Sequence, residues 1–134
     1  MRFLFFLILF LPKILYADIK SIGNYELKIL IKSGINIVDV RTHLEWKKVG
    51  ILNNSHLISL VNEKNKFVFE EWYNNFRQKV ELDKPLVFVC ATGVRSHYIS
   101  RLINKKLPDL RIYNLTNGIN YWIKSGNLIY NYQN

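Results

Sequence analysis

The chemistry that this sequence offers centres on one thiol. Cys90 is the single cysteine among 134 residues, and it stands in the stretch VFVCATGVRS, residues 87–96. A free cysteine is most often a small buried apolar residue, but its thiolate is a strong nucleophile where the surroundings stabilise negative charge. The residues next to Cys90 therefore decide between a packing role and a catalytic one.

The residues after Cys90 favour the thiolate. A helix that begins near Arg95 or Ser96 would direct its unpaired N–H groups and its dipole at negative charge. Gly93 lets the backbone curl, so that more N–H groups turn inward, and Arg95 adds a fixed positive charge. We therefore predict that Cys90 is a nucleophile at the rim of an anion-binding loop. The residues of this loop are Ala91, Thr92, Gly93, Val94, Arg95 and Ser96.

Other polar residues are expected to support this loop. Arg95 would orient an anion and could also close the loop through an ion pair, since the two roles can coexist, and Ser96 would cap the helix. Asp39 is expected to order its own turn, with substrate steering as the alternative. Arg41 would add positive potential near the site, or would pair with Glu45, four residues later in the sequence.

The elements that must position these residues alternate along the chain. Short apolar runs predict strands at residues 35–40, 85–89 and 110–115, and helical periodicity predicts helices at 24–34, 70–80, 96–107 and 119–126. This alternation is typical of an α/β domain with a largely parallel central sheet and helices on both faces. Ligands of such sheets bind beyond the carboxyl ends of the strands, where Asp39 and Cys90 are expected.

Three stretches resemble the landmarks of rhodanese domains, a family of sulfurtransferases. They are DVRTHLEWKKVG (39–50), CATGVRS (90–96) and IYNLTNGINYWIKSG (112–126). The resemblance implies a single rhodanese-like domain over residues 18–134. Two departures are visible. The stretch GILNNS (50–55) lacks the histidine, proline and second glycine frequent in the family. Asn117 replaces a glycine, and asparagine tolerates left-handed backbone better than most residues.

The resemblance implies transfer of a sulfane sulfur through a persulfide on Cys90. Thiosulfate is one such donor, a thiol or cyanide would be the acceptor, and the partners would be small sulfur-containing anions and thiols. Three alternatives remain: a persulfide carrier or binding module that serves a partner protein, a cysteine phosphatase, and a structural domain with an inert thiol. Phosphatase loops place five residues between cysteine and arginine, whereas four separate Cys90 from Arg95.

The first 17 residues, MRFLFFLILFLPKILYA, have the pattern of a cleaved signal peptide: a positive start, an apolar centre and a small residue at the end. An uncleaved membrane anchor is the alternative. Cleavage would leave no stable membrane insertion. The sequence thus predicts export, to the periplasm of a bacterium.

Charge and histidine spacing argue against other classes of function. The net charge is +9, but the basic residues are scattered and form no run of five, and together with an export signal this argues against a nucleic-acid partner. The three histidines show no metal-ligand spacing and one cysteine cannot build a thiolate zinc site. We therefore expect neither a metal nor a cofactor. The oligomeric state does not follow from the sequence.

Overall fold

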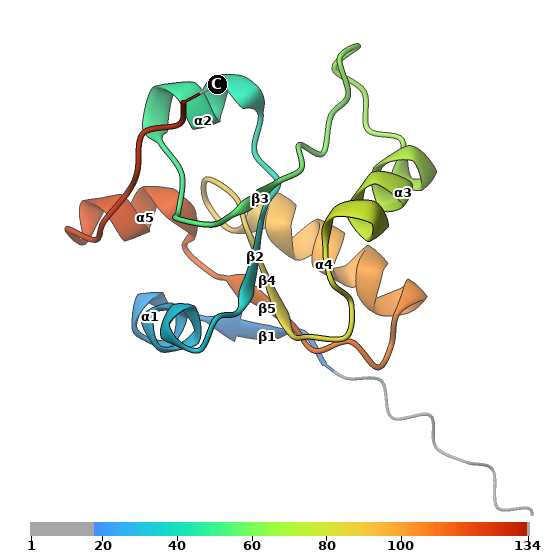
Figure 1. Ribbon diagram of the computed structural model, residues 1–134, viewed down its shortest axis with the longest axis horizontal. Coiled ribbons are helices and arrows are strands. Elements are labelled where there is room, and N and C mark those ends of the chain that lie inside the picture. The colour runs from blue at the N-terminus through green and yellow to red at the C-terminus, as the bar shows by residue number, and fades with distance from the viewer. Residues whose placement is uncertain (1–17, 134) are drawn as a thin grey trace, which may run out of the picture.

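The computed structural model describes residues 18–133, and the predicted signal peptide, residues 1–17, lies outside them. Strands and helices alternate along this part of the chain, as Figure 1 shows. The elements are β1 (Lys20–Ile22), α1 (Asn24–Lys32), β2 (Asn36–Asp39), α2 (His43–Val49), β3 (His56–Leu57), α3 (Phe69–Lys79), β4 (Leu86–Val89), α4 (Val94–Lys106), β5 (Ile112–Leu115) and α5 (Gly118–Lys124).

The strands form one parallel sheet in the order β1-β5-β4-β2-β3. The predicted α/β class with a parallel sheet is therefore confirmed. The central strand β4 reads LVFV and is buried at all four positions, which is the pattern of a strand covered on both faces. Because all strands run the same way, their carboxyl ends meet at one edge of the sheet, where Asp39 and Cys90 both lie.

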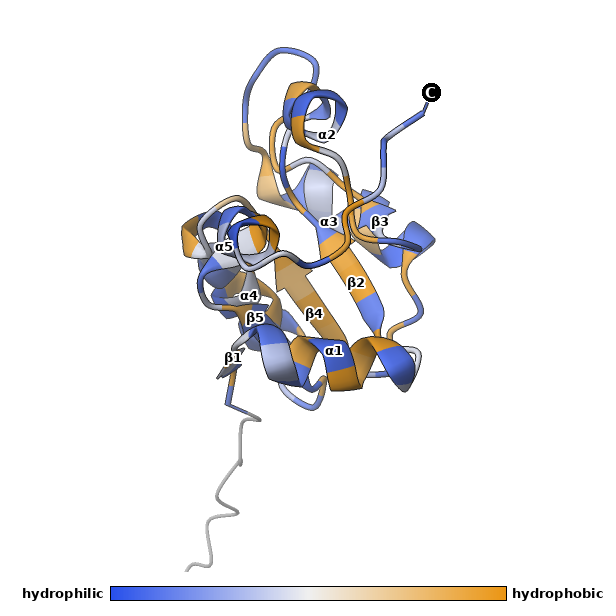
Figure 2. Ribbon diagram, turned by 90° about the vertical axis from the view of Figure 1, so that its left-hand side faces the viewer, coloured by the Kyte–Doolittle hydropathy of each residue, from blue (hydrophilic) through white to orange (hydrophobic). Residues whose placement is uncertain are grey.

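Helices cover both faces of the sheet. In Figure 1, α1 and α5 lie on one side and α3 and α4 on the other. The face toward α3 and α4 packs around aromatic and aliphatic residues that include Trp72, Phe76 and Phe88, and this cluster also contains Cys90. The opposite face packs Leu27 and Trp122 against the sheet with their aliphatic neighbours. Figure 2 shows the apolar central strands between helices of mixed hydropathy.

The structure contains short elements that the sequence did not predict. Strands β1 and β3 have three and two residues, and neither they nor α2 were predicted as elements. Only Trp46 of α2 is buried, so this helix gives little periodic signal. Trp46 and Trp122 both belong to the core, since the two are 6% and 4% exposed.

The described residues contain no membrane span: none of the helices between Asp18 and Gln133 is both long and apolar enough to cross a bilayer. Export therefore stays a prediction that depends on residues 1–17.

Candidate active site

The loop after β4 wraps around the sulfur of Cys90. The backbone N–H of Gly93 donates to Cys90 Sγ over 3.1 Å, and the N–H of Ser96 does so over 3.4 Å. Gly93 has φ of +92° and is the N-cap of α4. This left-handed conformation, which glycine adopts without strain, turns the loop amides inward. The result is a small nest of donors that favours negative charge on the sulfur.

Cys90 lies deeper than the sequence suggested. We predicted it at the rim of the loop, whereas its exposed fraction is 0% and it belongs to the core on the side of α3 and α4. The reason is its place directly after a central strand, so its side chain continues the inward alternation of Leu86 and Phe88. The loop amides nevertheless point at the sulfur, so burial and anion stabilisation occur together.

Ser96 has a different role from the predicted one. We expected it to cap the helix, but α4 begins at Val94 with Gly93 as its N-cap, so Ser96 lies within the first turn. Its hydroxyl is fully buried and lies 3.3 Å from Cys90 Sγ, in addition to its backbone N–H. Ser96 therefore donates to the sulfur through both its N–H and its hydroxyl, and it does not cap the helix.

The loop rests on the beginning of α5. The N–H groups of Ile119 and Asn120 donate to the carbonyl oxygens of Cys90 and Ala91, over 2.9 and 3.0 Å. Gly118 has φ of +68°, and a Cβ added there would lie 2.5 Å from Thr92 N. The neighbouring Asn117, which replaces a glycine of the family pattern, has φ of −99°. The left-handed backbone that we invoked at Asn117 is therefore not needed, because the retained glycine adopts it.

Arg95 is held by Glu45 of α2. Its guanidinium makes two hydrogen bonds to the Glu45 carboxylate, of 2.9 and 2.6 Å. The same carboxylate accepts the N–H of Thr42 at 2.8 Å and completes a capping box at the start of α2. Of the two predicted roles of Arg95, the structure shows the ion pair that closes the loop.

The pair changes the acid–base properties of both partners. Hydrogen bonding to Arg95, with a smaller contribution from Thr42, lowers the pKa of Glu45 to about 2. Conversely, the hydrogen bonds that Arg95 donates to Glu45, together with the negative charge of that carboxylate, raise the pKa of Arg95. The guanidinium therefore stays charged beside the loop.

Replacing Glu45 by glutamine is expected to make the free energy of unfolding less dependent on pH in the acid range. The folded-state pKa of Glu45 lies below its ordinary 4.5, so its contribution to the free energy of unfolding is complete above about pH 4.5 and is lost as the pH falls toward about 2. The pair is partly exposed, so screening reduces this contribution to about 1–2 kcal/mol. Denaturant unfolding at several pH values, with wild type and Glu45→Gln, measures it.

Glutamine keeps an acceptor for the capping box, so the comparison isolates the charge. Glu81→Gln is the matched control, because the pair of Glu81 and Lys84 lies on the surface and contributes little there. Parallel pH curves for wild type and Glu45→Gln would contradict the assignment.

Asp39 and Arg41 form a separate buried pair. The Arg41 side chain donates to both Asp39 oxygens, at 3.0 and 2.7 Å, and to the carbonyl of Gly50 at 2.7 Å. Asp39 also accepts the backbone N–H of Arg41 and so orders its own turn. The alternative pairing of Arg41 with Glu45 is wrong, because the carboxylate of Glu45 is engaged by Arg95. With 0% and 1% exposed, Asp39 and Arg41 fix the end of β2 and offer no free charge to a substrate.

Asn114 was not singled out from the sequence, although it is buried on β5 beneath the loop. Its Nδ2 donates to the carbonyl of Gly93 over 3.3 Å, while its Oδ1 is buried with no partner. Because Gly93 also supplies the nearest amide to Cys90 Sγ, Asn114 fixes the segment that carries that amide. Its position one residue before the motif residue Leu115 is the only signal that the sequence offers.

On the expectation from sequence that Cys90 accepts a sulfane sulfur, Asn114→Leu should lower the rate of sulfur loading about fivefold while leaving the fold intact. One hydrogen bond of about 1 kcal/mol corresponds to that factor, and removal of the unpaired Oδ1 offsets part of the cost to stability. The measurement is the rate of persulfide formation, together with thermal unfolding. Asn104→Leu is the matched control, since Asn104 also buries an unpaired Oδ1 but lies near the end of α4, whereas Asn114 is on β5. Equal rates in the two variants would remove Asn114 from the site.

Within residues 18–133, no group of three or more histidine, cysteine, aspartate or glutamate residues is arranged to hold a metal ion. The donors to Cys90 Sγ are two backbone N–H groups and one hydroxyl, and the Arg95–Glu45 pair closes the loop around them. The structure therefore defines a small α/β domain in which the loop after the central strand β4 surrounds a cysteine sulfur.

Comparison with known proteins defines the class further. A family model described as Rhodanese-like domain matches residues 24–125. The chain is 31% identical to the uncharacterized protein RP600 of Rickettsia prowazekii, over 78% of this chain and 84% of that protein. The protein therefore belongs to the rhodanese-like domain family.

Solved structures agree with this assignment. A rhodanese-related protein from Thermoplasma volcanium superposes with a TM-score of 0.66 at 26% identity, covering 82% of this chain and 96% of that one. A polysulfide-sulfur transferase homodimer from Wolinella succinogenes has a TM-score of 0.65 at 19% identity, over 88% of this chain and 82% of that one. The second likeness shows the fold alone.

Proposed function

We propose that the protein is a sulfurtransferase in which Cys90 accepts a sulfane sulfur and passes it on. The observation that carries this proposal is the convergence of two backbone N–H groups and one hydroxyl on Cys90 Sγ, at 3.1–3.4 Å. A cysteine that served only to fill the core would need no such donors. Members of the rhodanese-like family are often sulfurtransferases, which agrees with this interpretation.

The reaction proceeds as two displacements on sulfur. The Cys90 thiolate attacks the outer sulfur of thiosulfate, a new S–S bond forms, and sulfite leaves with the electron pair of the broken bond. The outer sulfur of the resulting persulfide carries the negative charge, which the loop amides stabilise. An acceptor thiolate or cyanide then attacks that outer sulfur, and Cys90 leaves as the thiolate. Covalent capture divides one transfer into two easier steps.

A non-catalytic persulfide carrier remains the second candidate, because Cys90 is wholly buried. A covered sulfur favours slow, partner-controlled release over rapid exchange with small acceptors. A phosphatase is less well supported. Only four residues separate Cys90 from Arg95, so the loop is smaller than a phosphatase loop with five. In addition, the Arg95 guanidinium is hydrogen-bonded to Glu45.

Thiosulfate loading tests the proposal. The purified protein is incubated with thiosulfate or glutathione persulfide, and mass spectrometry then locates any added sulfur. We expect one extra sulfur atom on the peptide that contains Cys90, and repeated turnover when cyanide or a thiol is added. One equivalent transferred without turnover would indicate the carrier, and hydrolysis of an aryl phosphate would indicate the phosphatase. No added sulfur from either donor would reject sulfur transfer altogether.

A further inference from the structure

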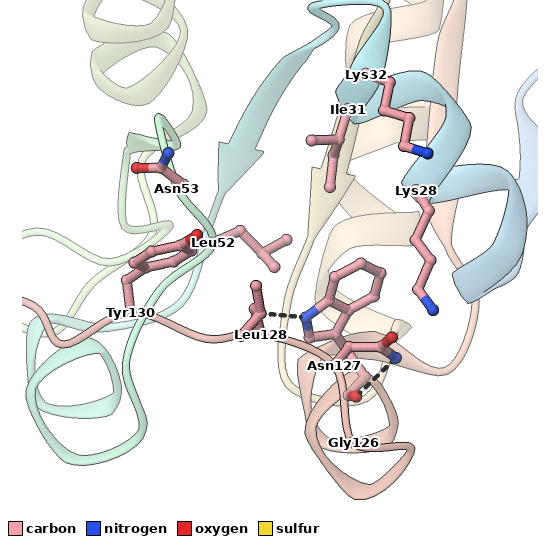
Figure 3. A pocket seen from close by; sticks show the side chains of 10 residues that line it. Lys28, Ile31, Lys32, Leu52, Asn53, Gly126, Asn127, Leu128 and Tyr130 are labelled. Carbon is pink, nitrogen blue, oxygen red and sulfur yellow. Dashed lines mark hydrogen bonds between the residues drawn. The ribbon is translucent and has the colours of Figure 1, made fainter.

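A hollow lies away from Cys90, on the face of the sheet that α1 and α5 cover. It has a volume of about 450 Å³, within the range of small-ligand sites. Its floor is made by Leu52 and Trp122, which belong to the core cluster opposite the one that contains Cys90. Figure 3 shows the hollow between α1 and the chain that follows α5.

The wall formed by residues 126–130 is fixed in place. The indole N–H of Trp122 donates to the carbonyl of Leu128 at 2.7 Å, and the Asn127 side chain donates to the carbonyl of Trp122 at 3.0 Å, as the dashed lines in Figure 3 show. Further along, Tyr130 and Ile51 exchange two backbone hydrogen bonds of 2.8 Å. The hollow is therefore preformed, which reduces the ordering cost of binding.

The wall keeps large apolar side chains in contact with solvent. Leu128 is 73% exposed and Tyr130 46%, and Ile31 of α1 lies at the opposite side with 36%. Exposed apolar residues around a buried apolar floor mark a place where an apolar group can be covered.

The charge at this hollow has one sign. Lys28 and Lys32 lie one turn apart on α1 and line it, and no lining residue is acidic. Neither lysine takes part in any of the ion pairs found among residues 18–133. Two cations beside an apolar floor are complementary to a molecule that has an apolar body and an anionic head.

We propose that this hollow binds a single-chain amphiphilic carboxylate of the fatty-acid type. The chain would lie over Trp122 and Leu52 and be covered by Leu128, and the carboxylate would lie between Lys28 and Lys32. The hollow does not involve Cys90, so a test of this binding site and a test of the proposed sulfur transfer have independent outcomes.

The test is calorimetric titration of the full chain with decanoate below its micelle concentration. We expect saturable binding of one decanoate, weaker binding of decanol, which lacks the charge, and no binding of inorganic phosphate, which lacks the chain. The double variant Lys28→Gln/Lys32→Gln should weaken decanoate about three- to tenfold, the scale of two exposed charge contacts. Leu128→Asp, at an exposed position, should abolish binding by placing a carboxylate in the wall.

Lys47→Gln/Lys48→Gln is the matched control, because it removes the same charge from α2, away from the hollow. Four outcomes would overturn the proposal: no saturable binding, equal affinity for decanol, binding of phosphate alone, or equal weakening by the two lysine pairs. The last two would indicate attraction of anions to a basic surface without a site.

Discussion

Replacing Cys90 with alanine is expected to abolish sulfur loading and turnover completely. The persulfide can form only on this sulfur, since the chain contains no other cysteine. The fold should survive, because removal of one buried sulfur atom leaves a small cavity that costs about 1 kcal/mol. Intact mass after thiosulfate treatment and the rate of thiocyanate formation measure the effect, and thermal unfolding confirms that the variant is folded.

Ser96→Ala separates the nucleophile from its donors. This variant keeps the backbone N–H that points at Cys90 and loses only the hydroxyl at 3.3 Å. It should load sulfur more slowly, by about the fivefold that one hydrogen bond of ~1 kcal/mol represents, and still turn over. Residual turnover in Cys90→Ala at the level of Ser96→Ala would contradict the assignment of Cys90 as the nucleophile.

Gly93→Ala is expected to destabilise the protein by about 3 kcal/mol or more and to stop sulfur loading. Two effects add at this position. The φ of +92° strains any residue with a Cβ, and the added Cβ would lie 2.7 Å from the carbonyl carbon of Thr116, against backbone that cannot move aside as a side chain would. The loop must therefore shift, and the Gly93 amide then leaves Cys90 Sγ.

The chain offers a matched control for this substitution. Gly34 has φ of +81°, and nothing lies within 4 Å of an added Cβ, so Gly34→Ala carries only the conformational strain of about 1–2 kcal/mol. Chemical denaturation of the two variants separates strain from collision. Equal losses of stability in Gly93→Ala and Gly34→Ala would mean that Gly93 does not lie against the backbone of Thr116.

The sequence predicted the parts of this fold that carry continuous apolar signal. Central strand β4 reads LVFV, and both its faces are covered, so a short apolar run identified it. The edge strands β1 and β3 read KSI and HL, and at that length pairing with a neighbour defines a strand while composition does not. The loop motif likewise predicted the inward amides, because Gly93 and the following helix determine their direction locally.

The sequence did not predict contacts between segments that are distant along the chain. Glu45 and Arg95 are separated by 50 positions, and only the sheet topology brings α2 and α4 together. The local rule for helices therefore paired Glu45 with the wrong arginine. Asn114 was missed for the same reason, since its partner Gly93 lies 21 positions away. The predicted capping role of Ser96 was wrong because α4 begins at Val94 with Gly93 as its N-cap, so Ser96 lies inside the helix.

The complete enclosure of Cys90 bears on how the protein would survive oxidants. Peroxide converts accessible thiolates first to sulfenic and then to irreversible sulfonic acids, and susceptibility follows exposure as well as charge. Here three donors contact the sulfur, but it is 0% exposed, so we expect peroxide to reach it slowly. Such a buried thiol would still be able to accept a sulfur atom under oxidising conditions that inactivate a solvent-exposed thiol.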